Sequence, residues 1–157
     1  MLDAIIWLDC FLPSRGNQDL AWSILDEALK RNDEVLYATE TAKDVFYNVA
    51  RSLKAEERAM RGRVSDGQAQ AINEAAWGVV GFMADVATAV GAEQAEVMLA
   101  HSLKSSHRDF EDNLLLAAAL RAEADYLVTR DKSLVLHAPV TALLPEDMLE
   151  LLVGGTL

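Results

Sequence analysis

Acidic residues follow several segments of this sequence that have the character of β-strands. Asp3 follows the first apolar residues, Asp44 lies just after VLYA, and Asp131 comes directly after YLVTR. Asp109 and Asp112 begin the segment DFED. Functional groups of parallel α/β sheets gather at the carboxyl ends of the strands, so these are the acids that could carry chemistry. Asp112 is poorly explained as a cap alone, since the apolar run after it must be buried and a carboxylate there needs a partner, for which a metal ion is a candidate.

Each acid taken singly also has a purely structural explanation. Thr41 and Asp44 are spaced as a helix N-cap and its N3 acid, and so are Asp109 and Asp112. Acids in a first turn also gain from the helix dipole. Evidence for chemistry therefore lies in the joint arrangement. The three histidines have no metal-ligand spacing and are expected to be ordinary surface or partly buried side chains: His101, His107 and His137.

Alternating helices and strands position these acids. Asn17 is placed to cap a helix with an apolar face that reaches Leu29. Further helices are predicted over residues 41–53, 68–85, 92–103, 109–123 and 144–152. Strands are predicted at 34–38, 86–90 and 124–129, with a short one at 138–140, while 54–67 is expected as a polar connection and 130–134 as a turn. The alternation predicts an α/β protein with a central, mostly parallel sheet covered on both faces, a three-layer α/β/α fold in one domain over 1–157.

Composition limits the class of protein. The chain has 157 residues and a formal net charge of −11, which argues against broad attraction to nucleic acid but does not exclude an enzyme that acts on it. No apolar run approaches the ~20 residues of a membrane span, and no secretion leader is evident. The single cysteine, Cys10, suits a reducing cytoplasm.

Three blocks of the sequence resemble one known family. The opening DAIIWLD resembles the DTNVWLD that opens PIN domains, and TAKDVFYNVAR resembles their second acidic motif. Residues 109–134 are very similar to their carboxyl-terminal block, DFEDAxxxAAAL followed by a strand that ends in TRDK. Order and spacing agree over nearly the whole chain, and the last block is the specific part.

The resemblance implies a metal-dependent nuclease that acts on single-stranded or structured RNA, in a family that includes the VapC toxins of toxin–antitoxin pairs. It implies Mg²⁺ or Mn²⁺ as cofactor, because these ions prefer carboxylate oxygens. An antitoxin protein and a second copy of the chain are the implied partners, besides RNA. Carried over by position, the metal-binding and catalytic acids are Asp3, Asp44, Asp112 and Asp131, with Asp109 as an accessory acid and Thr129 as the hydroxyl beside the last acid.

The sequence departs from the family pattern at its first motif. Ala4 and Ile5 replace the Thr and Asn that give polar support to the first acid, which favours an alternative function as a catalytically weakened RNA-binding or protein-interaction module. Only Met1 and Leu2 precede Asp3. Either a piece of strand is missing there, or AIIWL is the first strand and Asp9 ends it at the catalytic position.

Basic and aromatic residues offer further expectations. Arg and Lys side chains near the acids either meet RNA phosphates or pair with neighbouring acids on the surface: Lys104, Arg108, Arg130 and Lys132. Four aromatic residues are expected mostly in the core, and any that are exposed are candidates for a dimer or antitoxin surface: Trp22, Phe46, Tyr47 and Trp77.

Overall fold

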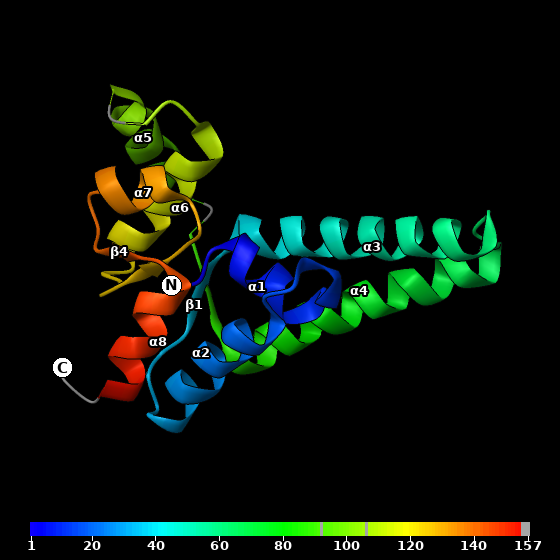
Figure 1. The fold of residues 1–157 in the computed structure, drawn as a ribbon. Coiled ribbons are helices and arrows are strands. Elements are labelled where there is room, and N and C mark those ends of the chain that lie inside the picture. The colour runs from blue at the N-terminus through cyan, green and yellow to red at the C-terminus, as the bar shows by residue number, and fades with distance from the viewer. Residues whose placement is uncertain (92, 106, 155–157) are drawn as a thin grey trace.

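A computed structural model describes residues 1–91, 93–105 and 107–154. The chain is a mostly helical α/β protein with short parallel strands (Figure 1). Its elements, with two 3₁₀ turns at Pro13–Arg15 and Leu103–Ser105, are α1 (Ala4–Phe11), α2 (Gln18–Lys30), β1 (Leu36–Ala38), α3 (Thr39–Arg61), α4 (Asp66–Val86), β2 (Thr88–Val90), α5 (Gln94–Ser102), α6 (Phe110–Arg121), β3 (Leu127–Val128), α7 (Lys132–His137), β4 (Ala142–Leu143) and α8 (Pro145–Gly154).

The strands form two parallel pairs, and the start of the chain runs between them. β1 pairs with β2, and β3 pairs with β4. The amide of Leu2 donates to the carbonyl of Leu36 at 2.8 Å, and the amide of Val128 donates to the carbonyl of Met1 at 2.9 Å. Leu2 and Val128 also form a parallel bridge. The first residues are therefore bonded to both pairs, and they lead directly into Asp3.

Side chains of the extended segments alternate between two apolar clusters. Leu2, Tyr37 and Val128 belong to a cluster with residues of α1, α2, α3, α4 and α8. Their chain neighbours Met1, Leu36 and Leu127 belong to a second cluster with residues of α6 and α7. This alternation is the period of two that extended backbone imposes. Because β1 and β2, β3 and β4, and Leu2 and Val128 all pair in parallel, the carboxyl ends of the paired segments point in the same direction.

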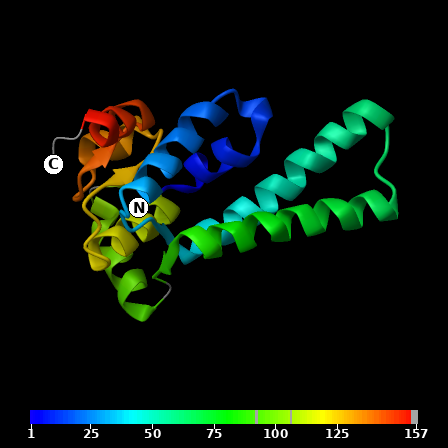
Figure 2. The same cartoon turned by 90° about the horizontal axis from the view of Figure 1, so that it is seen from below.

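Helices α3 and α4 form a long hairpin that extends away from the rest of the molecule (Figures 1 and 2). The prediction of a polar connection over 54–67 is wrong for its first half, because Lys, Ala, Glu, Arg and Met are strong helix formers and α3 continues to Arg61. The helix ends at Gly62, whose φ of 75° is the left-handed conformation that glycine adopts readily. Ser65 and Gln68 then form a capping box that begins α4.

Other short segments also differ from the prediction. Residues 130–134 are not a turn: α7 begins at Lys132, because the Asp131 carboxylate accepts a hydrogen bond from the Ser133 amide and caps the helix. The last strand is at Ala142–Leu143 instead of 138–140, and AIIWL lies in α1 and not in a strand. The stretch VVGFMAD and its neighbours in α4 do form the predicted helix.

The four aromatic residues divide into two groups. Trp22 and Phe46 pack partly buried against the first cluster. The expectation of a core position is wrong for Tyr47 and Trp77, whose exposed fractions are 65% and 58%. The ring centroids of Tyr47 and Trp77 lie 5.2 Å and 5.0 Å from that of Phe46, so the three rings form one group across α3 and α4. Among the described residues, none of the helices has both the length and the apolar character that crossing a membrane requires.

Candidate metal centre

The structure brings the N-terminal acid to the end of the chain's last motif. Asp3 is the N-cap residue of α1, directly after the segment bonded to β1 and β3. Its Oδ2 accepts a hydrogen bond of 2.6 Å from the Thr129 hydroxyl, which follows β3. The same Thr129 oxygen accepts a hydrogen bond of 3.1 Å from the Asp131 amide. Thr129 thus supplies to Asp3 a side-chain hydrogen bond that the apolar side chains of Ala4 and Ile5 cannot supply.

Asp112 lies in the first turn of α6, where Asp109 is the N-cap. Asp109 Oδ1 accepts hydrogen bonds from the amides of Glu111 at 2.8 Å and Asp112 at 3.2 Å. The predicted capping role of Asp109 is confirmed by these bonds. They leave the Asp112 carboxylate free to face the carboxyl ends of the strands. The position of Asp112 is therefore set by the first turn of α6 and by the hydrogen bond from its amide to Asp109.

The Asp3, Asp112 and Asp131 carboxylates interact electrostatically. Burial raises the pKa of Asp3; the Thr129 hydrogen bond opposes this, and the charge of Asp131 adds to it. Partial burial also raises the pKa of Asp112, with further increases from Asp109, Asp131 and Asp3 and an opposing effect of His107. The pKa values of two acids are raised, as expected from crowding, but the main cause is burial and the repulsion between the carboxylates is the smaller contribution. Such a cluster favours a bound cation, which removes the repulsion.

Asp44 lines a cavity of about 320 Å³ together with Asp3 and Asp112, among other residues. The predicted Thr41 cap is wrong, because α3 begins at Thr39 and Asp44 falls in its second turn. Lys43 Nζ lies 3.3 Å from Asp44 Oδ1. The Asp44 carboxylate therefore comes to the cavity from α3 and is paired with the ammonium group of Lys43.

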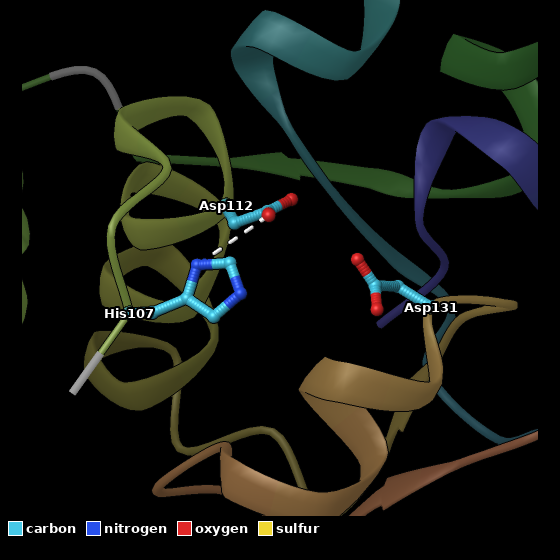
Figure 3. A group of neighbouring side chains, drawn as sticks. All are labelled: His107, Asp112 and Asp131. Atoms are coloured by element: carbon cyan, nitrogen blue, oxygen red, sulfur yellow. Dashed lines mark ion pairs between the residues drawn. The ribbon is translucent and has the colours of Figure 1, made fainter.

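The tightest group of metal-ligand atoms includes a histidine. His107, Asp112 and Asp131 each offer one ligand atom, and these atoms lie within 4.8 Å of one another (Figure 3). Figure 3 shows the Asp131 carboxylate facing His107 and Asp112 across the space between α6 and α7. The expectation that His107 is ordinary misses this placement. The spacing of the histidines in the sequence does not indicate that His107 lies near the acids. The one available signal is that His107 lies just before the DFED block.

Asp9 has no place in this site, which excludes the alternative that it ends the first strand at the catalytic position. It lies in α1 with an exposed fraction of 0%. Its two carboxylate oxygens accept hydrogen bonds from Arg15 Nε and Arg130 Nε, both at 2.6 Å. Arg130 Nη1 also lies 3.4 Å from Glu146. Arg130 is thus paired with acids, and it anchors the loop that carries Asp131.

The donor set fits a divalent cation. Two opposite ligands of an octahedral ion with bonds of ~2.1 Å lie about 4.2 Å apart, and the ligand atoms of His107, Asp112 and Asp131 all lie within 4.8 Å of one another. The carboxylates of Asp112 and Asp131 together neutralise the charge of one such ion, and the carboxylate of Asp3 interacts electrostatically with both. The arrangement is therefore able to hold a metal ion beside an open cavity, where the ion leaves positions for water or a phosphate.

Comparison with protein families gives one finding over most of the chain. A family model described as PIN domain matches residues 1–133. This range includes the acids at both ends of the site, from Asp3 to Asp131. Comparisons with curated proteins and with solved structures give no match.

Proposed function

The chain belongs to the PIN-domain family, and from that premise we propose that it is a divalent-metal-dependent nuclease that hydrolyses RNA phosphodiester bonds. PIN domains are generally nucleases, and they usually use a divalent metal. The observation that carries the proposal is the convergence of Asp112 and Asp131 with Asp3, from opposite ends of the chain.

The side chains have separate roles in this proposal. When bound, Mg²⁺ or Mn²⁺ activates a water molecule and stabilises charge on the attacked phosphate. Asp112 and Asp131 hold the ion from α6 and from the start of α7, and Asp3 contributes from the N-cap of α1. Asp44 adds a further carboxylate to the cavity that Asp3 and Asp112 also line. Asp109 and Thr129 keep Asp112 and Asp3 oriented through the hydrogen bonds described above.

We also infer that the two strand pairs and the first residues of the chain act as one central sheet between two layers of helices. The hydrogen bonds of Leu2 to Leu36 and of Val128 to Met1 support this inference. So does the alternation of side chains between the two apolar clusters. Such a sheet aligns the ends of its strands and so brings together the acids that follow those ends; Asp3 and Asp44 line one cavity with Asp112, and Asp131 lies close to Asp112.

The test is a metal titration with a panel of single-stranded and structured RNAs. Wild type is expected to cut RNA with Mn²⁺ or Mg²⁺ and to stop with excess chelator. Asp112→Asn and Asp131→Asn are expected to lose about 100-fold or more of the rate, because each removes a ligand charge. Asp147→Asn is the matched control, since Asp147 is an exposed acid in the first turn of α8.

Several outcomes would contradict parts of the proposal. Cleavage that survives both substitutions or excess chelator excludes the metal mechanism. Cleavage of DNA alone excludes RNA as the substrate. If Mn²⁺ raises the melting temperature but nothing is cut, the protein is instead an RNA-binding or protein-interaction module.

A toxin role with an antitoxin partner is the biological setting that we propose. Exposed Tyr47 and Trp77 give the helical hairpin an apolar surface for an antitoxin segment or a second copy of the chain. Induced expression of the wild type is expected to arrest the growth of the host cells, because RNA in their cytoplasm is cut. Expression of Asp112→Asn is expected to be harmless. A short upstream gene whose product restores growth would supply the antitoxin, and equal growth with both variants would exclude the role.

A further inference from the structure

We propose that the His107 imidazole is a direct ligand of the metal centre and makes the site prefer Mn²⁺ over Mg²⁺. This inference rests on the proposed metal-dependent function and goes beyond it, because it adds a nitrogen donor to an otherwise all-oxygen set. The cluster that carries it is His107 with Asp112 and Asp131 (Figure 3).

The hydrogen bonding of His107 points to a missing partner. Its side chain has an exposed fraction of only 14%, and Nδ1 lies 3.5 Å from Oδ2 of Asp112. Nδ1 is buried, and within the part of the chain that the structure describes it makes no hydrogen bond. Buried polar atoms are rarely left without a partner. A cation between the imidazole and the two carboxylates satisfies this nitrogen together with both acids.

The main chain of His107 is fixed from both sides. Its amide donates a hydrogen bond of 3.0 Å to the Leu103 carbonyl. Its carbonyl accepts a hydrogen bond of 2.9 Å from Nδ2 of Asn113, a side chain with an exposed fraction of 2%. Asn113 is the chain neighbour of Asp112, so one turn of α6 positions the carboxylate and holds the histidine beside it. A ligand held in this way loses little freedom when an ion binds.

The chemistry of the donor set gives the metal preference. Mg²⁺ demands oxygen ligands in a nearly ideal octahedron and dehydrates reluctantly. Transition-metal ions accept imidazole nitrogen more readily, and Mn²⁺ is the first of that series. A site with one imidazole and two or three carboxylates therefore penalises Mg²⁺ more than Mn²⁺. An all-carboxylate site does not make this distinction to the same degree.

The competing explanation is an ion pair between a protonated His107 and Asp112. The two explanations predict opposite effects of removing the side chain. Loss of a ligand weakens Mn²⁺ binding, whereas loss of a positive charge beside Asp112 strengthens the binding of any cation. Mn²⁺ affinity of a His107 variant therefore separates them by its direction of change.

The experiment uses the full chain loaded with Mn²⁺ alone. Pulsed electron paramagnetic resonance of the wild-type protein is expected to show coupling of Mn²⁺ to a directly bound imidazole nitrogen. His107→Ala and His107→Gln are expected to lose this coupling and at least about tenfold in Mn²⁺ affinity, since even indirect supports of a ligand are worth that much. Their Mg²⁺ affinity is expected to change less than their Mn²⁺ affinity. His101→Gln, at an exposed histidine of α5, is the matched control and is expected to behave as wild type.

The outcomes separate this proposal from the proposed function. If wild type binds Mn²⁺ through Asp112 but shows no nitrogen coupling, or if His107→Ala binds Mn²⁺ more tightly, the ligand proposal is wrong and the nuclease proposal stands. If the coupling is present and depends on His107 but no RNA is cut, the nuclease proposal fails and the ligand stands. Because the coupling is measured on wild type, a variant that fails to fold does not decide the question.

Discussion

The Thr129 hydroxyl joins Asp3 to the segment that carries Asp131, although Thr129 and Asp3 are 126 positions apart in the chain. Its oxygen donates to the Asp3 carboxylate at 2.6 Å and accepts from the Asp131 amide at 3.1 Å. Thr129 itself is fully buried. One side chain therefore fixes the relative positions of two proposed metal-binding acids.

Thr129→Val is expected to weaken both folding and metal binding. The isosteric valine removes the hydroxyl that donates to Asp3 Oδ2 and accepts from the Asp131 amide, and losing these hydrogen bonds costs about 1–3 kcal/mol of the free energy of unfolding. It also releases the orientation of Asp3, for an expected loss of about 10–100-fold in Mn²⁺ affinity. Urea denaturation and isothermal titration calorimetry measure the two effects. Thr129→Ser keeps the hydroxyl and is expected to retain wild-type metal affinity; equal losses in both variants would show that the methyl group matters instead.

Asp9→Asn is expected to destabilise the protein by about 3 kcal/mol. The substitution removes the buried charge that pairs with Arg15 and Arg130, and breaking a buried pair on one side leaves uncompensated charge. Because Arg130 precedes Asp131 in the chain, metal affinity is expected to fall as well. Urea denaturation gives the stability change. Asp26→Asn is the control: its pair with Lys30 is well exposed on both sides, and its loss is expected to leave the stability close to that of wild type. A similar cost for the two variants would contradict the structural role of Asp9.

Gly91→Ala is expected to cost about 1–3 kcal/mol of stability. Gly91 follows β2 with a φ of 92°, and a Cβ atom there would lie 3.3 Å from the Cβ of Ala118 in α6. The close approach sets the distance of α6, and so of Asp112, from the strands. The matched variant is Gly78→Ala in α4, where an added Cβ meets nothing within 4 Å. It is expected to stabilise by about 0.5–1 kcal/mol. Thermal and urea denaturation compare the two, and a stable Gly91→Ala protein would refute this constraint on α6.

The long elements were predictable because their patterns are local. The apolar stripe of α2, the run NLLLAAAL of α6 and the short apolar strand before Thr39 each identify their element within a few residues. The DFED block likewise predicts both the Asp109 cap and the inward position of Asp112. The family resemblance is strongest in the same block, and residues 1–133 match the family model.

The parts that sequence could not predict depend on distant partners. Nothing near Asp9 in the chain indicates that Arg130 pairs with it, and the burial of Asp9 depends on that pair. The helix start within segment 130–134 is the exception, because its cause is local: Asp131 accepts a hydrogen bond from the Ser133 amide and caps α7. His107 can be recognised as a candidate metal ligand only when the fold brings Asp112 of α6 and Asp131 at the start of α7 close to it. Short strands such as β4 have too few residues to show a period of two, so their positions follow from the sheet partners.

The contribution of Asp3 and Asp112 to the stability of the metal-free protein is expected to fall as the pH rises above about 4. Burial raises the folded-state pKa of Asp3 and Asp112 above the ordinary value of 3.8. The folded protein then keeps protons that the unfolded chain has released, so the contribution of these two acids is fully present below pH 3.8 and is lost as the pH rises through their folded pKa values.

A metal ion binds the ionised acids, so the stabilisation by Mn²⁺ grows over the same range. Melting temperatures between pH 4 and pH 7, with chelator and with Mn²⁺, measure both trends. Asp3→Asn is expected to flatten the chelator curve and to reduce the Mn²⁺ effect, and an unchanged pH dependence in this variant would show that other groups are responsible.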